Sequence, residues 1–416
     1  MNLFKQILFI VFLLHLSFLS AQEKKTISLK TKTINLPYGL TQNIPDNEPT
    51  IGLALSGGGA RGLAQIGVIK ALEEVGINIR IIAGTSMGSI IGGVYSSGYT
   101  VEEMDSMVMN TDWDRLLSLG NTSERSELFI DQKISEDRSL FTLRLNGFSP
   151  VLPTSFNEGI RLSNYLTLLC LASPVISENS FDDLFMRYRS VCTNLIDGNL
   201  VVLSSGSLAR AMRASSSVSF LLAPVVVDSL TLVDGGLVSN IPVNVALDMG
   251  ADYVIAVNTT SDLRNIEELE LPWNVADQTV SIPMKRLEKA ELLKANFHLQ
   301  PNIDNWSSTD FANLDSLMLA GYNYTKSVLP IIQAQIDSLS RAKSEVETYW
   351  IKNIKSTTNQ NDFEKPYLQK YSLMDSVSSI EIFEDLSELY TTGSFDSLFA
   401  IIEKDGDSTK VSFKYT

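Results

Sequence analysis

Two glycine-rich turns in the first quarter of the chain carry residues that can do chemistry. In one of them, Ser86 stands between Gly84 and Gly88, after an apolar run and before a helical pattern. The spacing G-x-S-x-G between a strand and a helix is the nucleophile elbow of serine hydrolases, where a sharp turn lifts the hydroxyl out of the sheet. Gly84 and Gly88 are needed because larger side chains there would collide with neighbouring backbone. The pattern predicts that Ser86 is a nucleophile.

The other turn precedes Ser86 and has the spacing G-x-G-x-x-G. Gly57, Gly59 and Gly62 follow an apolar strand pattern and open a helix. A dinucleotide site needs an acidic residue at the end of the next strand, and that strand ends without one. A P-loop needs Lys after its last glycine, and Leu63 stands there. The context therefore speaks against both nucleotide-binding interpretations.

An oxyanion hole suits this glycine turn better. Ester hydrolysis builds negative charge on the former carbonyl oxygen, and each preorganised donor that stabilises it is worth roughly 3–4 kcal/mol. We expect the N–H groups of Gly58 and Gly59 to be the donors, because glycine lets the backbone approach a substrate closely. Arg61 follows them. The sequence leaves open whether Arg61 holds the loop, meets a phosphate or forms a salt bridge at the helix start.

A serine nucleophile needs a base, and the chain offers few histidines. His15 lies in an apolar N-terminal segment, so a Ser-His-Asp triad would have to use His298. The competing base is a carboxylate on a turn after a strand, and Asp234, followed by Gly235 and Gly236, fits. A Ser–Asp dyad requires a carboxylate that is close to the hydroxyl and shielded from water, which raises its basicity. Both bases stay open, and the shortage of histidine favours Asp234.

The elements around these residues alternate between strand and helix patterns. Strands are predicted at 51–55, 79–83, 189–195, 199–203, 230–233 and 253–257, and helices at 63–76, 87–98, 101–110, 157–172, 207–214, 242–249 and 314–347. This alternation predicts an α/β fold with a mostly parallel central sheet and helices on both faces. The tail has the order helix, strand, turn, strand, and predicts a small α+β C-terminal module.

Three motifs, at residues 57–62, 84–88 and 234–236, stand in the order seen in patatin-like phospholipases. The chain resembles an exported bacterial branch of that family over roughly residues 49–340. The resemblance implies a patatin-like α/β fold and lipid acyl hydrolysis through an acyl-enzyme, with no metal or other cofactor. It implies the following site residues: Ser86 as nucleophile, Asp234 as base, Gly57, Gly58 and Gly59 around the oxyanion, and Arg61, Gly62, Gly84, Gly88, Gly235 and Gly236 as supporting positions.

Charge and the N-terminus limit the partners and the location. The formal charge of −15 argues against nucleic acid as the main partner and against broad attraction to anionic membranes. Lys5, an apolar run over 7–19 and the small residue Ala21 predict a signal peptide over 1–21, with an uncleaved anchor as the alternative. We therefore expect export to the periplasm, outer membrane or cell surface.

The predicted domain order is a signal peptide (1–21), a linker (22–48), a patatin-like acyl hydrolase domain (49–347), a second linker (348–376) and a module over 377–416 that resembles part of a POTRA domain. In exported patatin-like proteins such a module links to an outer-membrane barrel, whose ten-residue alternating strands this sequence lacks. The expected partners are a phospholipid or other lipid ester, a membrane surface, and a barrel that is either separate or missing from this chain.

A different class of function stays open beside the hydrolase. The chain would then be a surface or outer-membrane assembly module with a vestigial hydrolase domain, as the POTRA-like tail and the segment 218–224 suggest. That segment lacks two prolines of the family pattern, and its Phe220-Leu221-Leu222 is either core or a membrane-contacting loop. Cys170 and Cys192 are expected to be buried thiols without a disulfide.

Overall fold

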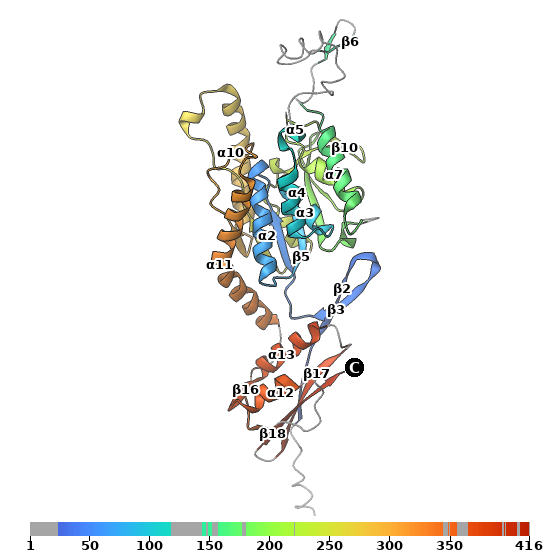
Figure 1. Ribbon diagram of the computed structural model, residues 1–416, viewed down its shortest axis with the longest axis vertical. Coiled ribbons are helices and arrows are strands. Elements are labelled where there is room, and N and C mark those ends of the chain that lie inside the picture. The colour runs from blue at the N-terminus through green and yellow to red at the C-terminus, as the bar shows by residue number, and fades with distance from the viewer. Residues whose placement is uncertain are drawn as a thin grey trace, which may run out of the picture. The chain divides into compact units, whose positions relative to one another are not determined.

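The computed structural model describes residues 24–117, 144–146, 149–151, 157–176, 180–219, 221–343, 348, 350–355, 365–392, 395, 397–405 and 408–415 (Figure 1). The predicted signal peptide lies outside the described residues. The chain forms two compact units: unit 1 comprises Met1–Ile34, Thr41–Glu48 and Asp337–Thr416, and unit 2 comprises Asn35–Leu40 and Pro49–Ile336.

Unit 2 is built on one central sheet. Its strand order is β10 (Val225–Val227), β11 (Leu230–Asp234), β8 (Arg187–Asn194), β5 (Ile79–Thr85), β4 (Ile51–Leu55), β12 (Tyr253–Val257) and β13 (Phe297–Leu299), with β9 (Leu200–Leu203) beside β8. Neighbours from β8 to β13 run parallel, whereas β9, β10 and β11 make antiparallel pairs. The predicted mostly parallel sheet is confirmed.

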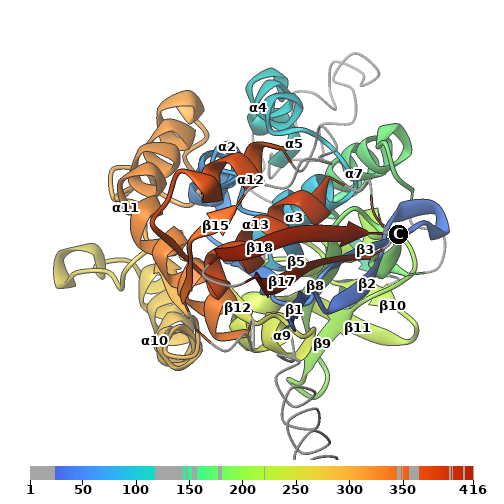
Figure 2. The same cartoon turned by 90° about the horizontal axis from the view of Figure 1, so that it is seen from below.

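Helices cover both faces of this sheet (Figure 2). α3 (Met87–Ser96) packs on one face, where Gly92 lies against Ile82 and Leu55. α9 (Val243–Asp248) packs on the other, where its apolar residues join Ala54 and Ile81 in a buried cluster. The central strands β4 and β12 are buried along their whole length because their alternate side chains meet a helix on each face, whereas the edge strands β9 and β10 are partly exposed.

The remaining helices of unit 2 lie around these layers. They are α2 (Ala64–Glu74), α4 (Val101–Asn110), α5 (Trp113–Leu117), α7 (Ile160–Ala172), α8 (Leu208–Ser215), α10 (Pro272–Leu292) and α11 (Leu314–Lys343, whose last turns belong to unit 1), with short 3-10 turns that include η2 (Gly59–Leu63) and η4 (Gly235–Leu237). The strand at 253–257 and the helix at 101–110 were predicted with the bounds that the structure has. Sequence patterns gave no prediction for α10. No helix within the described ranges is long and apolar enough to cross a bilayer.

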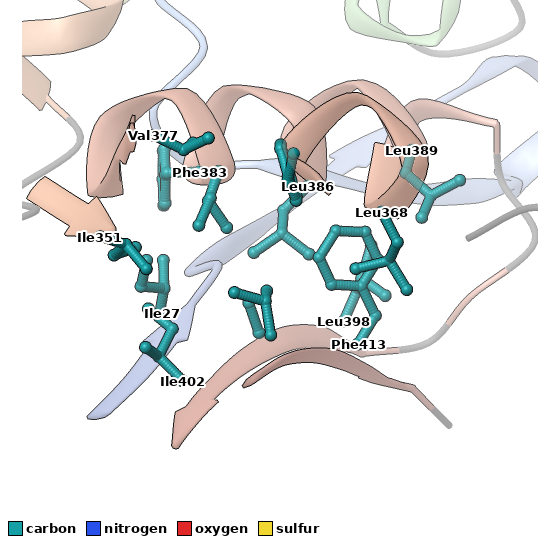
Figure 3. Close-up of a cluster of buried hydrophobic side chains, with 14 of the residues drawn as sticks. Ile27, Ile351, Leu368, Val377, Phe383, Leu386, Leu389, Leu398, Ile402 and Phe413 are labelled. Carbon is teal, nitrogen blue, oxygen red and sulfur yellow. The ribbon is translucent and has the colours of Figure 1, made fainter. Parts of the chain in front are cut away.

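Unit 1 has a four-stranded sheet with the order β1 (Lys24–Ser28), β17 (Leu398–Asp405), β18 (Ser408–Tyr415), β15 (Ile354–Lys355). α13 (Ser379–Thr391) packs Phe383, Leu386 and Leu389 toward the sheet residues Ile27 and Phe413, as Figure 3 shows. The unit also contains α12 (Lys365–Ser372) and the strand pairs β14 (Trp350–Lys352) with β16 (Ser376–Ser378) and β2 (Thr31–Asn35) with β3 (Thr41–Pro45). The predicted C-terminal hairpin is confirmed by β17 and β18.

The structure contradicts the two predicted linkers. Residues 22–48 contain β1, β2 and β3, and residues 348–376 contain β14, β15 and α12. β1 forms an edge strand of unit 1, where Lys24 pairs with Glu403. The C-terminal module therefore begins well before residue 377 and includes a strand from the other end of the chain. Local patterns missed it because strands this short acquire their pairing only from distant segments.

Candidate active site

Ser86 lies in a sharp turn between β5 and α3. It has φ 55° and ψ −124°, a conformation that costs free energy for a residue with a Cβ and that marks functional sites. A Cβ on Gly84 would lie 2.4 Å from the Gly88 carbonyl oxygen, and one on Gly88 would lie 2.4 Å from that of Leu55. Both predicted glycines therefore let helix and strand approach closely enough to form the elbow.

Hydrogen bonds from distant segments hold this turn. The Ser86 N–H donates to Ser215 Oγ at 3.0 Å, and Ser215 Oγ in turn donates to the Val191 carbonyl at 2.5 Å. The hydroxyl of Thr85 donates to the Ser239 carbonyl at 2.8 Å. The elbow is thus fastened to α8, to β8 and to the segment that follows β11.

Strand register brings Asp234 to Ser86. Thr85 at the end of β5 lies beside Val191 of β8, and the next residue of β8, Cys192, lies beside Asp234 at the end of β11. Ser86 and Asp234 therefore flank the same part of β8. Asp234 is buried, and its Oδ1 accepts a hydrogen bond from the Gly236 N–H at 2.7 Å.

Burial raises the pKa of the Asp234 carboxyl group, while hydrogen bonding from the Ser86 side chain and from the Gly236 N–H lowers it, and the resulting pKa is about 6. Desolvation wins because burial disfavours the charged form of a carboxyl group. The site therefore combines a serine hydroxyl with a carboxylate of unusual basicity. It brings together the two residues that the sequence predicts as a dyad.

The raised pKa predicts that Asp234→Asn stabilises the fold at neutral pH. Between about pH 4 and pH 6 the native carboxyl group holds a proton that the unfolded one has lost, so stability falls as pH rises through this range. Above pH 6, the charged carboxylate lowers the free energy of unfolding by about 2–3 kcal/mol, and an uncharged amide at this position avoids this loss. We expect the melting temperature of Asp234→Asn to exceed that of the wild type at pH 8, with the difference vanishing near pH 4. A variant that melts lower at both pH values would contradict this.

The glycine turn presents two N–H groups. The Gly57 N–H donates to the Asn240 carbonyl at 3.2 Å, and the Ala60 N–H donates to the Ser308 carbonyl at 2.8 Å. Between them, the N–H groups of Gly58 and Gly59 have no acceptor among the residues that the structure describes. Gly58 and Gly59 are therefore the available donors.

Gly57 contributes space, and not a free N–H group, to the glycine turn. Its N–H is occupied, and a Cβ on it would lie 3.1 Å from the Cβ of Ser86 and 2.5 Å from Asn240 Oδ1. Gly57 was predicted to lie around the oxyanion, and its N–H is not available there as a donor. Because Gly57 has no side chain, Ser86 and Asn240 can lie close to the backbone of the glycine turn.

One further N–H group, that of Met87, is placed so that it could act as a donor, and it was not predicted from the sequence. Met87 is the first residue of α3, where helical N–H groups have no acceptor within the helix. Within the described part of the chain its N–H has no partner elsewhere. The residue after the nucleophile supplies an oxyanion donor in α/β hydrolases. The position of Met87 directly after Ser86 was therefore enough to name it as a candidate donor. Gly62 leaves room for the Met87 side chain, since a Cβ on Gly62 would lie 2.6 Å from Met87 Cγ.

Arg61 is buried and fixes the segments around the glycine turn. Its guanidinium donates to backbone carbonyls at 2.9–3.2 Å and forms an ion pair with Asp304 at 3.6 Å; the carbonyls belong to Thr259, Thr260, Ile303 and Trp306. Of the roles left open by the sequence, the structure supports holding the loop and pairing with an acid. Gly235, directly after Asp234, lets this turn lie close to β8, because a Cβ on it would lie 2.3 Å from the Val191 carbonyl oxygen.

His298 is not brought to Ser86. It lies on β13, whose neighbours in order are β12, β4 and β5. Three strand spacings amount to about 14 Å, too far for a hydrogen bond to the elbow. His298 instead lines a polar cavity of about 330 Å³ together with Asp262 and Asp304. This placement argues against the triad alternative.

Two smaller predictions can also be compared with the structure. Cys170 and Cys192 are both free; Cys192 is buried, as predicted, and Cys170 is half-buried. Burial raises the pKa of the Cys170 thiol to about 12. In the segment 218–224, Leu222 is buried, which fits the core alternative, and Phe220 lies outside the described residues.

Several known proteins are similar to parts of this sequence. Residues 53–247 match the family described as patatin-like phospholipase. Lysophospholipase NTE1 of Scheffersomyces stipitis is 28% identical over 321 residues, which cover 69% of this chain and 19% of the relative. Patatin-like phospholipase domain-containing protein 6 of Mus musculus is 29% identical over 306 residues, which cover 67% and 20%. Among solved structures, VipD from Legionella pneumophila is similar at a TM-score of 0.36 with 15% identity, over 76% of this chain and 73% of that one. The chain thus spans about a fifth of the length of these curated relatives.

Proposed function

We propose that this chain, in which residues 53–247 form a patatin-like phospholipase domain, is a serine hydrolase of carboxylic esters that acts on phospholipids or lysophospholipids. The observation that carries the proposal is the serine in a strained elbow beside a buried carboxylate of raised pKa. The substrate class follows from the relatives named as lysophospholipases.

In the proposed reaction, Ser86 Oγ attacks the acyl carbonyl carbon, and Asp234 accepts the hydroxyl proton. The carbonyl oxygen becomes an oxyanion, which the N–H groups of Gly58, Gly59 and Met87 stabilise. The tetrahedral intermediate collapses, the ester C–O bond breaks, and the leaving alcohol takes the proton from Asp234. Water then attacks the acyl-enzyme and gives its proton to Asp234, which returns it to Ser86 as the fatty acid leaves.

Labelling with a fluorophosphonate tests this proposal. We expect the probe to modify Ser86, located by mass spectrometry of the labelled peptide, and a short ester such as p-nitrophenyl butyrate to be hydrolysed. A folded protein that neither reacts with the probe nor hydrolyses the ester would favour the alternative of an assembly module with a vestigial hydrolase domain.

The proposed base predicts the pH dependence of the reaction. Because Asp234 must be deprotonated and has a pKa of about 6, kcat/KM is expected to rise about tenfold per pH unit below pH 6 and to level off above pH 7. Steady-state kinetics between pH 4.5 and pH 8.5 measure this profile. A profile that is flat from pH 4.5 to pH 8.5 would show that no group of pKa about 6 must be deprotonated, and would contradict the proposed base.

We also propose that the protein is exported and that unit 1 contacts an outer-membrane partner. The N-terminal pattern of Lys5, the apolar run 7–19 and Ala21 supports export. The order β15, α12, β16, α13, β17, β18, in which β16 pairs only with β14 among the described strands, supports a POTRA-like unit. Cell fractionation with N-terminal sequencing tests export: a form that begins at Gln22 outside the cytoplasm supports it, and a cytoplasmic form with an intact N-terminus contradicts it.

A further inference from the structure

α10 buries two carboxylates that the proposed reaction does not use. Glu288 and Glu291 lie one helical turn apart and are only 5% and 8% exposed, whereas Leu287 on the same helix is 45% exposed. Removing a carboxylate from water is unfavourable unless it is paired and hydrogen-bonded. The contacts of these two carboxylates therefore indicate why they are buried on a helix that is otherwise mostly exposed.

Glu288 contacts two segments that border the active site. Its Oε1 accepts a hydrogen bond from Asn240 Nδ2 at 2.7 Å. Its Oε2 accepts one from the Thr260 hydroxyl at 3.3 Å and lies 2.8 Å from Lys285 Nζ. Thr260 is also one of the carbonyl acceptors of Arg61. Glu288 thus joins the segment after β11 to the segment after β12.

Asn240 lies between the two turns of the proposed site. Its backbone carbonyl accepts the Gly57 N–H at 3.2 Å. Its side-chain Oδ1 lies so close to the backbone of Gly57 and Gly236 that a Cβ on either would come within 2.5 Å and 3.0 Å of it. Since Gly236 donates to Asp234, one side chain touches both the oxyanion turn and the turn that carries the base.

We propose that Glu288 is a positioning residue of the hydrolase, which fixes the Asn240 amide so that Asn240 holds the oxyanion turn in register with the Asp234 turn. With Asn240 held, the Gly57 N–H stays engaged and the N–H groups of Gly58 and Gly59 stay free. A loose Asn240 would let the donors and the base move independently, and a displacement of about 1 Å costs catalysis about a hundredfold. The inference rests on the proposed function.

The test measures kcat and KM for p-nitrophenyl butyrate and the rate of fluorophosphonate labelling. Glu288→Leu is expected to lower kcat and the labelling rate at least about tenfold, with KM within about twofold of wild type. Glu288→Gln keeps an acceptor for Asn240 Nδ2 and is expected to retain most of the activity. The double variant Glu288→Leu, Asn240→Ala is expected to be no slower than Asn240→Ala alone, because both changes remove one interaction.

Asp385→Asn in unit 1 is the matched control. Asp385 is 7% exposed and accepts hydrogen bonds from Lys370 Nζ at 3.0 Å and from Tyr371 at 2.6 Å, so its loss also removes the interactions of a buried carboxylate. It is expected to lower the melting temperature without changing kcat. Should Glu288→Leu fail to fold, Asn240→Ala carries the same test, with the same loss of kcat at constant KM.

The outcomes separate the two proposals. An active, labelled wild type with Glu288→Leu unchanged, or with the double variant showing the product of the two single losses, would overturn the positioning role alone. So would an equal loss of kcat in Asp385→Asn. A wild type that neither hydrolyses the ester nor labels at Ser86 would overturn the proposed function and this role with it.

Discussion

Ser86→Ala is expected to lower kcat/KM for ester hydrolysis by at least about a thousandfold, because the other hydroxyl of the elbow, on Thr85, donates to the Ser239 carbonyl and does not replace the nucleophile. Asp234→Asn is expected to cause a loss of similar order, since an amide cannot accept the hydroxyl proton, while the variant keeps the hydrogen bond from Gly236 and its fold. Assays with p-nitrophenyl butyrate at pH 8 measure both losses, with melting curves to establish that the variants are folded.

His298→Ala is the control for this pair of variants. Because His298 lies three strands away from β5, its removal is expected to leave kcat/KM unchanged. Full activity in Ser86→Ala would refute the serine mechanism. Collapse in His298→Ala with survival of Asp234→Asn would replace the dyad by a triad.

Gly59→Ala has the second-largest expected effect. Gly59 has φ 59°, and a Cβ on it would lie 2.2 Å from the Ser308 carbonyl oxygen, so the turn must shift to admit alanine. Moving one oxyanion donor out of place is expected to lower kcat about a hundredfold or more. Steady-state kinetics on the folded variant measure the loss.

Gly76→Ala separates this effect from backbone strain. Gly76 follows α2 with φ 76°, and a Cβ on it would have no neighbour within 4 Å. Both variants place alanine at positive φ, which costs about 1 kcal/mol in stability, and Gly59→Ala adds the clash with the Ser308 carbonyl oxygen. Only Gly59→Ala should lose kcat. Equal kcat in both variants and the wild type would show that the glycine turn does not bind the oxyanion.

The part of the site that is local in sequence was predictable. Gly84, Ser86 and Gly88 act within one turn between adjacent elements, so their spacing alone specifies a strand, a sharp bend and a helix. The alternation of strand and helix patterns gave the parallel sheet for the same reason. Asp234 was predictable as a candidate, because glycines after a strand end mark a tight turn.

What depends on distant contacts was not predictable. Which N–H groups of the glycine turn are free is decided by Asn240 and Ser308, far along the chain. Glu288 is one of several charged residues in its stretch of sequence, and nothing in the local pattern shows that Asn240 and Thr260 will contact it. The distance of His298 from Ser86 follows from strand order, which the sequence pattern leaves undetermined.

The pairing of β1 with β17 has a consequence for synthesis on the ribosome. β1 emerges before all of residues 49–336, and its partner emerges after them. Every residue of the central sheet is therefore available for folding while β1 still has an unsatisfied edge, the kind of edge that recruits strands from other chains. Translation that stops before Leu398 would leave that edge open permanently. We infer that truncation between residues 337 and 397 would produce aggregation, although every residue of the proposed catalytic site had been made.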